Sequence, residues 1–189
     1  NTFLDPNRHR QSRAAQTRDA GNVLSMPRAC LVLTLEASWG PVRVMTSHLE
    51  FYSDAARHAQ AIALRDWHRQ CSGLAAFPPK VMAGTPYQSK AHTLDTILCG
   101  DFNFEQDSPE HASMIEKGSG FDLFNSWNVL HPDAPYPATF RIFDRTYGPE
   151  PVGCDFFFVS ESLKSRVKAF SVNQATQASD HQPVLLELG

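Results

Sequence analysis

The apolar positions of this chain fall into short runs separated by polar and turn-forming residues, and this pattern predicts strands. The runs rich in Val, Leu and Phe occupy residues 29–35, 42–49, 94–99, 155–160, 169–174 and 183–188. The sequence SWGP at 38–41 is a turn between the first two runs, which predicts a hairpin. We therefore expect a core built on sheets.

Between the second and third runs, the apolar residues recur at steps of three and four, which predicts an amphipathic helix over residues 53–70. Ser53 is a suitable N-cap for this helix, and Gly73 is a suitable end. We expect its buried side to carry the recurring apolar residues, which are Ala56, Ala59, Ile62, Ala63 and Trp67.

Shorter helical segments and two loops complete the pattern. Pro109 suits the first turn of a helix that Gly118 would end, and ESLKSRV at 161–167 predicts a helical turn. Residues 72–93 and 125–153 are rich in turn-forming residues, which predicts loops. Strands thus dominate, with helices between some of them, and the fold class is α/β or α+β with a layered sheet core.

The chain has 189 residues, 42% of them hydrophobic, so it can bury a core, and we expect one domain over residues 1–189. Residues 1–28 are polar and lack a hydrophobic period, which predicts a loop or arm. A basic loop that faces the substrate is the alternative, because this stretch contains Arg8, Arg10, Arg13 and Arg18.

The net charge of −3 provides no global positive field to attract nucleic acid, although a local basic cleft stays compatible with such a substrate. The four cysteines, Cys30, Cys71, Cys99 and Cys154, lack zinc-binding spacing, and this pattern favours a reducing, cytoplasmic setting. No apolar run reaches membrane-spanning length and no signal peptide is visible. Because the chain begins at Asn1, a targeting signal upstream is compatible with this interpretation.

Three polar clusters lie where apolar runs end or begin, which holds their side chains rigidly and near solvent. The strongest is GDFN at 100–103. In an extended stretch Asp101 and Asn103 share one side of the chain, where a carboxylate and a carboxamide can hold a water and a phosphoryl oxygen. Gly100 lets the backbone bend as it leaves the strand. The alternative is an Asx turn that caps the strand end.

The second cluster is SDHQPV at 179–184, and the third is TSHLE at 46–50. Asp180 is a hard oxygen ligand suited to Mg²⁺ or Mn²⁺, and His181 can act as a base or as a cation against phosphate. His48 lies at the end of its predicted strand. A surface turn and a structural histidine are the ordinary alternatives for these two clusters.

Asp155 opens the apolar strand DFFFVS and would be costly to bury without a partner. An aspartate that accepts a hydrogen bond from a histidine ring fixes its tautomer and stabilises its charged form. We expect His181 to be this partner.

Asp, Asn and His side chains around an oxygen-liganded metal suit phosphoester hydrolysis, in which the metal neutralises phosphate charge while a positioned water attacks. We expect Mg²⁺ or Mn²⁺ as the cofactor, with Asp180, Asp101 and Asn103 as metal ligands. This Cys-poor, carboxylate-rich set argues against zinc. The sequence contains no GxSxG, so a Ser/His/Asp hydrolase is a poor fit.

With these residues in order, the chain resembles the endonuclease/exonuclease/phosphatase superfamily of Mg²⁺-dependent phosphohydrolases. The motifs that carry the resemblance are TSHLE, GDFN, CDFFFVS and SDHQPVLLEL, in family order, with Arg57 and Gln60 in the helix after the first. The resemblance runs from about Gly21 to the C-terminus. It implies a four-layer α/β/β/α sandwich of the DNase I-like type, with the active site along one edge of the paired sheets.

The resemblance also implies roles for the clustered residues. Asp101 would orient or deprotonate the attacking water, and Asn103 would hold the phosphate. His181 would contact the scissile phosphate, with Asp155 orienting its ring. His48 would stabilise the transition state or assist the leaving group, while Asp180 would help to bind the metal.

One departure from the family is visible. Its early strands carry an Asn and then a Glu that is a principal metal ligand, and GNVLSMPRACLVL at 21–33 looks like the segment that follows that Glu. The resemblance therefore implies that the family's N-terminal strands are missing from this chain. The chain would then be either a fragment of a longer enzyme or a degenerate member of the family. A fragment alone should bind metal weakly, and its exposed sheet edge is open to pairing with a second copy of the chain.

We interpret the protein as a metal-dependent phosphodiesterase or phosphatase. Its substrate class stays open between a nucleic acid, a phospholipid and a small phosphoester. The alternative is a non-catalytic binding or scaffold module that keeps the fold but has lost the metal site.

Overall fold

The computed structural model describes residues 26–80, 84 and 92–189, and its first two strands form the predicted hairpin. Strand β1 (Cys30–Ala37) pairs antiparallel with β2 (Gly40–His48), with Leu33 opposite Val44. The turn between them lies at residues 38–39. The hairpin predicted from these two runs is therefore confirmed.

The hairpin continues into a five-stranded sheet of order β1-β2-β3-β5-β4. Strand β3 (Thr96–Asp101) runs parallel to β2, and β5 (Asp155–Ser160) runs antiparallel to β3. The short strand β4 (Leu123–Asn125) pairs with β5. The ends of β2 and β3 and the start of β5 consequently meet at one edge of the sheet.

A second, two-stranded sheet packs against the first. It consists of β6 (Val167–Val172) and β7 (Val184–Leu188), which are antiparallel, and a 3-10 helix, η1 (Glu161–Arg166), leads into it from β5. Leu186 and Leu188 of β7 pack into a cluster with Val42 and Val159 of the larger sheet. This apolar contact joins the two sheets.

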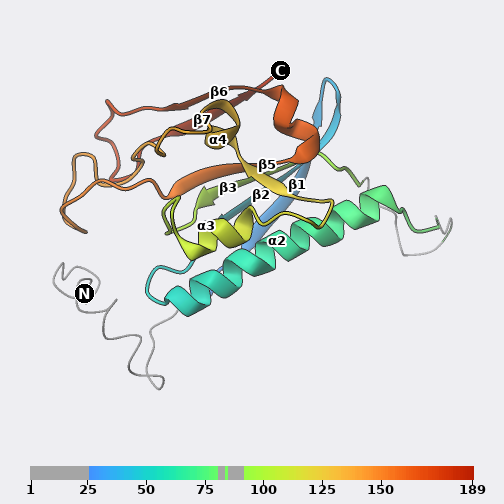
Figure 1. The fold of residues 1–189 in the computed structure, drawn as a ribbon, viewed down its shortest axis with the longest axis horizontal. Coiled ribbons are helices and arrows are strands. Elements are labelled where there is room, and N and C mark those ends of the chain that lie inside the picture. The colour runs from blue at the N-terminus through green and yellow to red at the C-terminus, as the bar shows by residue number, and fades with distance from the viewer. Residues whose placement is uncertain (1–25, 81–83, 85–91) are drawn as a thin grey trace.

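Three α-helices accompany the sheets in the described residues: α2 (Asp54–Ala76), α3 (Pro109–Met114) and α4 (Ser126–Leu130). Helices α2 and α3 contact each other on the side of the five-stranded sheet away from β6 and β7 (Figure 1). The main core lies there, around Met45, Leu98 and Phe102. Of the four layers expected, the described residues thus supply a helical layer and two sheets, and the α/β class is confirmed.

The sequence-based prediction of the buried face of α2 is wrong, although the helix and its N-cap are confirmed. Ser53 accepts a hydrogen bond from the Ala56 backbone N–H, as an N-cap does. Trp67, however, is 51% exposed. The buried positions are Arg57, Ala61, Leu64, His68 and Ser72. On this face Ala61 and Leu64 pack into the main core, and Arg57 donates to backbone carbonyls, a polar contact that an apolar periodicity cannot reveal.

Several predicted boundaries are also wrong. Helix α2 continues through Gly73, because the helix tolerates a glycine at a cost of about 1 kcal/mol and the Phe77 N–H still caps the Gly73 carbonyl. Helix α3 ends at Met114, before Gly118. The loop expected over 125–153 contains α4, whose N-cap is Asn125. Residues 1–25, 81–83 and 85–91, which belong to the predicted arm and loop, lie outside the described residues.

Strand β1 forms one edge of the larger sheet and is unusually exposed. Leu31, Leu33 and Leu35 lie on one face of this strand and are 62%, 37% and 53% exposed. The two-stranded sheet does not cover them. The described residues therefore leave an apolar sheet edge open.

Among the helices of the described ranges, none combines the length and apolar character that crossing a membrane requires.

Candidate active site

The sheet register sets three predicted site residues in one row. His48 of β2 lies opposite Asp101 of β3, which lies opposite Asp155 of β5. The Nε2 atom of His48 is 3.3 Å from Oδ2 of Asp101. The strands approach closely here because Gly100 has no side chain: a Cβ atom on it would lie 1.9 Å from the Ser47 carbonyl oxygen.

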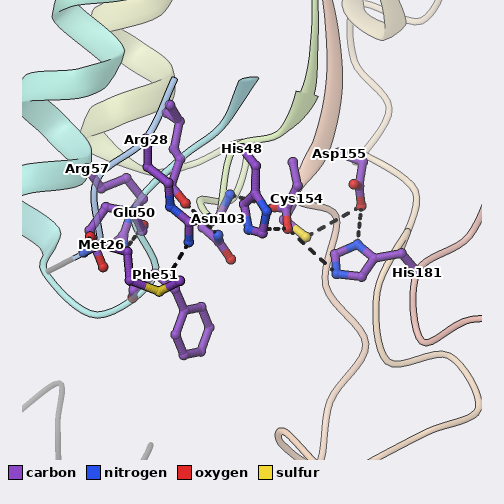
Figure 2. A network of polar contacts seen from close by, with 12 residues as sticks. Met26, Arg28, His48, Glu50, Phe51, Arg57, Asn103, Cys154, Asp155 and His181 are labelled. Atoms are coloured by element: carbon purple, nitrogen blue, oxygen red, sulfur yellow. Dashed lines mark hydrogen bonds and ion pairs between the residues drawn. The ribbon is translucent and has the colours of Figure 1, made fainter. Parts of the chain in front are cut away.

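His181 enters this row from the loop before β7. Its Nδ1 atom is 2.9 Å from Oδ2 of Asp155, and its Nε2 atom is 3.6 Å from Oδ2 of Asp101. Figure 2 shows the His181 ring facing Asp155 and the sulfur of Cys154. The structure therefore brings residues from four separate segments of the chain to one sheet edge.

Two residues that sequence reasoning missed hold His181 and Asp155 in place. The Thr139 hydroxyl is fully buried and donates a 2.6 Å hydrogen bond to Oδ2 of Asp155. It also accepts hydrogen bonds from the backbone N–H groups of Cys154 and Asp155. Phe140 stacks on the His181 ring, with centroids 4.3 Å apart. The only sequence signal was their place in an aromatic-rich loop.

Asn103 adopts the local geometry that was the alternative for GDFN. Its backbone N–H donates to Oδ1 of Asp101 at 2.9 Å, which is an Asx turn, and its φ of 53° lies in the left-handed region that Asn tolerates. Its side-chain Nδ2 donates to the Leu49 carbonyl. The Asn103 side chain thus ties the end of β3 to the residue that follows β2. Oδ2 of Asp101 stays free of this turn and faces His48 and His181.

Asp180 precedes His181 in the loop before β7 and is half-buried. Its Oδ1 atom accepts a hydrogen bond from the Ser179 hydroxyl, and its carbonyl accepts one from the Arg141 N–H. Phe140 and His181 form a β-bridge next to this bond. The backbone of the 139–141 segment thus fixes the position of both Asp180 and His181.

The charges of the site shift its titrating groups in opposite directions. Burial, with the nearby charge of Asp155, raises the pKa of Asp101. Burial by itself would lower the pKa of His181, but the hydrogen bond and charge of Asp155, then Asp101 and Asp180, raise it above the ordinary value. His181 therefore favours its cationic form, and Asp101 binds protons more readily than an exposed aspartate.

Two observations bear on whether these residues fit a divalent cation. Asp101 and Asp155 face each other across paired strands, and the charge of Asp155 raises the pKa of Asp101, so a cation would relieve this repulsion. Asp101, Asp180 and the Asn103 carboxamide offer the hard oxygen atoms that Mg²⁺ and Mn²⁺ prefer. These residue types suit such an ion, whereas the ligand atoms that lie within 4.8 Å of one another in the described ranges are those of Asp101, Cys154 and His181, without Asp180.

One residue near these carboxylates is a thiol. Cys154 is 4% exposed, and its Sγ lies 3.6 Å from Oδ2 of Asp155. Burial and the charges of Asp101 and Asp155 raise the pKa of this thiol. All four cysteines are free, and Cys154 is the buried one. Its place directly before Asp155 was visible in the sequence, but no metal-binding spacing marked it.

The segment after β2 is anchored by polar contacts rather than exposed to a substrate. Glu50 is fully buried, and its carboxylate accepts hydrogen bonds from the N–H groups of Met26 and Tyr52. Arg57 of α2 donates to the carbonyls of Glu50 and Phe51, and Gln60 accepts from the Glu50 N–H. Arg57, seen beside Glu50 and Phe51 in Figure 2, and Gln60 therefore support the backbone that follows His48.

No protein-family model matches the sequence, and no curated protein matches it either. Solved structures do match the fold. A mannosyl-6-phosphatase from Bacteroides thetaiotaomicron matches with a TM-score of 0.60 and 22% identity, over 90% of this chain and 60% of its own. An endonuclease/exonuclease/phosphatase family protein from the same organism matches with a TM-score of 0.59 and 23% identity, over 86% of this chain and 54% of its own.

A truncated TDP2 from Caenorhabditis elegans matches with a TM-score of 0.58 and 19% identity, over 88% of this chain and 60% of its own. These neighbours define the class of the fold, which is the endonuclease/exonuclease/phosphatase type, DNase I-like. The chain spans between 54% and 60% of the length of these three structures.

Proposed function

We propose that the protein is a divalent-metal-dependent phosphoester hydrolase whose reaction takes place at the edge formed by β2, β3 and β5. One observation carries the proposal: Oδ2 of Asp101 lies 3.3 Å from Nε2 of His48 and 3.6 Å from Nε2 of His181, whose other ring nitrogen is held by Asp155. A carboxylate between two imidazoles can both receive and return a proton. The fold class supports this interpretation.

In this proposal Asp101 orients and deprotonates the attacking water, a role that suits a carboxylate whose pKa is raised. His181, held as a cation by Asp155, faces the scissile phosphate. Asn103 uses one amide hydrogen on the Leu49 carbonyl and has a second for a phosphoryl oxygen. His48 is 55% exposed and stabilises the transition state or protonates the leaving group.

Asp180, Asp101 and Asn103 would hold the metal. When bound, Mg²⁺ or Mn²⁺ neutralises phosphate charge. We also propose a reducing, cytoplasmic setting, which the four free thiols support.

The substrate class stays open within phosphoesters. By their names, one neighbour is a mannosyl-6-phosphatase, and another, from Neisseria, is a 3′ phosphatase bound to a product DNA hairpin. The latter has 16% identity and a TM-score of 0.55. A sugar phosphate and a DNA 3′-phosphate are therefore sensible substrates to compare.

The test is hydrolysis of bis-(4-nitrophenyl) phosphate and 4-nitrophenyl phosphate with Mg²⁺ or Mn²⁺. Asp180→Ala and His181→Ala should each lower turnover by roughly 100-fold or more, because the first removes a proposed metal ligand and the second removes the cation that faces the phosphate. His92→Ala, which removes an exposed histidine elsewhere, is the matched control and should leave turnover unchanged. Retention of turnover in both site variants would show that the site is wrongly assigned.

A further inference from the structure

A thiol lies within the candidate active site, and its neighbours are a carboxylate and an imidazole. One ligand atom each from Asp101, Cys154 and His181 lies within 4.8 Å of the others, and this is the one such group of His, Cys, Asp or Glu in the described ranges. Tetrahedral zinc, with metal–ligand distances of about 2.0–2.3 Å, separates its ligands by roughly 3.2–3.7 Å. Small side-chain rotations would bring these three atoms to that spacing.

The hydrogen bond that His181 makes to Asp155 uses Nδ1 and leaves Nε2 to bind a metal. Nδ1 is engaged with Oδ2 of Asp155, so Nε2, which faces Asp101, is the ring nitrogen that can bind a metal once it gives up its proton. A carboxylate that holds the far nitrogen of a ligating histidine is the usual support of a zinc site, since it fixes the tautomer and raises basicity. Thr139 in turn fixes Asp155.

The access to this group is also suitable. Cys154 is 4% exposed and forms its floor, whereas the side chains of Asp101 and His181 are 15% and 30% exposed and open to solvent. The carboxylate and the imidazole thus give an ion access from solvent to a group whose third ligand atom is the sulfur of the buried Cys154. On binding, the Cys154 thiol and Nε2 of the cationic His181 ring each lose a proton to solvent as the sulfur–metal and nitrogen–metal bonds form.

We propose that Asp101, Cys154 and His181 bind a thiophilic divalent cation, zinc above all, and that this ion inhibits the enzyme. A mixed sulfur, nitrogen and oxygen set selects zinc over Mg²⁺, which prefers oxygen alone. The inhibition rests on the proposed function: the ion would occupy Asp101 and Nε2 of His181, the groups assigned there to the water and the phosphate. The binding does not depend on that function.

Binding is tested by titrating the protein with Cd²⁺ and following the ultraviolet thiolate-to-cadmium charge-transfer band. Zinc affinity is then measured by competition with a chromophoric chelator. Wild type should show the band and bind one zinc ion tightly. Cys154→Ala and Cys154→Ser should lose the band and weaken zinc binding by roughly 100-fold, and Asp155→Asn should weaken it about 10- to 100-fold. Cys71→Ser, which removes a free thiol on α2, should change neither.

Inhibition is measured in each protein as the ratio of its hydrolysis rate with zinc to its rate without zinc. This ratio is independent of any change that a substitution makes to the basal rate. Zinc should inhibit wild type and Cys71→Ser, a chelator should restore them, and the ratio in Cys154→Ser should approach one. Absence of the band in folded wild type, or its survival in both Cys154 variants, overturns the site. If the charge-transfer band depends on Cys154 but no protein hydrolyses the phosphoester, the zinc site is supported and the proposed function is contradicted.

Discussion

At the scale of single residues, one buried hydroxyl determines whether Asp155 can hold His181. Thr139 donates to the carboxylate of Asp155 and accepts from two backbone N–H groups. Thr139→Val should lower the free energy of unfolding by about 1–3 kcal/mol, because it leaves buried polar groups without partners. It should also lower kcat more than it raises KM, since the ring of His181 loses its alignment.

The comparison variant is Thr139→Ser, which keeps the hydroxyl and should recover most of both losses. Urea unfolding and steady-state kinetics measure the two effects. Equal behaviour of the valine and serine variants would show that the methyl group, and not the hydroxyl, matters at this position.

Two buried histidines outside the site should make the fold sensitive to acid. Burial, with the charges of Arg43 and Arg69, lowers the pKa of His68 to about 4, and burial lowers that of His111 to about 4. The unfolded chain binds protons below about pH 6.5 while these folded side chains do not, so stability falls as pH drops from about 6.5 toward 4. Each histidine should contribute a slope of roughly 1.4 kcal/mol per pH unit in that window.

Urea unfolding at several pH values measures this slope. His68→Gln and His111→Gln should each reduce it, whatever they do to stability at neutral pH, whereas His131→Gln removes an exposed histidine and should not. An unchanged slope in both buried variants would contradict the assignment.

At the scale of elements, the site depends on the close approach of β2 and β3 at Gly100. This residue has a φ of +139°, and an added Cβ would lie 1.9 Å from the Ser47 carbonyl oxygen. Gly100→Ala should therefore separate the strand ends and lower the free energy of unfolding by more than about 3 kcal/mol. Gly40→Ala is the matched control, because Gly40 has a φ of +129° with nothing within 4 Å.

Gly40→Ala should cost only the backbone strain, about 1–3 kcal/mol. Thermal and urea unfolding compare the two variants. Equal destabilisation would show that the strands tolerate a wider separation.

The elements also show what the sequence could and could not predict. The hairpin, β3, β5 and β7 were predictable because their apolar runs are bounded by turns, and the polar clusters at their ends marked His48, Asp101 and His181 as neighbours. The burial of Arg57 in place of Trp67 was not predictable, since it depends on partners in other segments. Thr139 joins the site through tertiary contacts such as the bridge of Phe140 with Val152, and Cys154, although next to Asp155 in the sequence, had no metal-binding spacing to mark it.

At the scale of the whole molecule, the exposed edge of the larger sheet carries a consequence for association. Among the described residues, β2 is the one strand that pairs with β1, and Leu31, Leu33 and Leu35 are exposed on β1. We expect two copies to pair through β1, because a largely apolar edge strand, whose one charged residue is Glu36 near its end, is a template for another strand. Leu33→Lys should abolish this pairing, and Leu74→Lys on α2 is the control.

Sedimentation velocity over a range of concentrations measures the pairing. Wild type and Leu74→Lys should shift toward a dimer as concentration rises, and Leu33→Lys should remain monomeric. A wild-type protein that stays monomeric throughout would contradict this expectation.

The central claim is that side chains from separate segments act as one unit on a phosphoester, and a double-mutant cycle on metal-dependent hydrolysis tests it most directly. His181→Ala should lower turnover roughly 100- to 10,000-fold, and Asp155→Asn should lower it less. Because Asp155 acts through His181, the double variant should lose no more than His181→Ala alone. Independent, multiplying losses, or a wild type without metal-dependent turnover, would contradict the account.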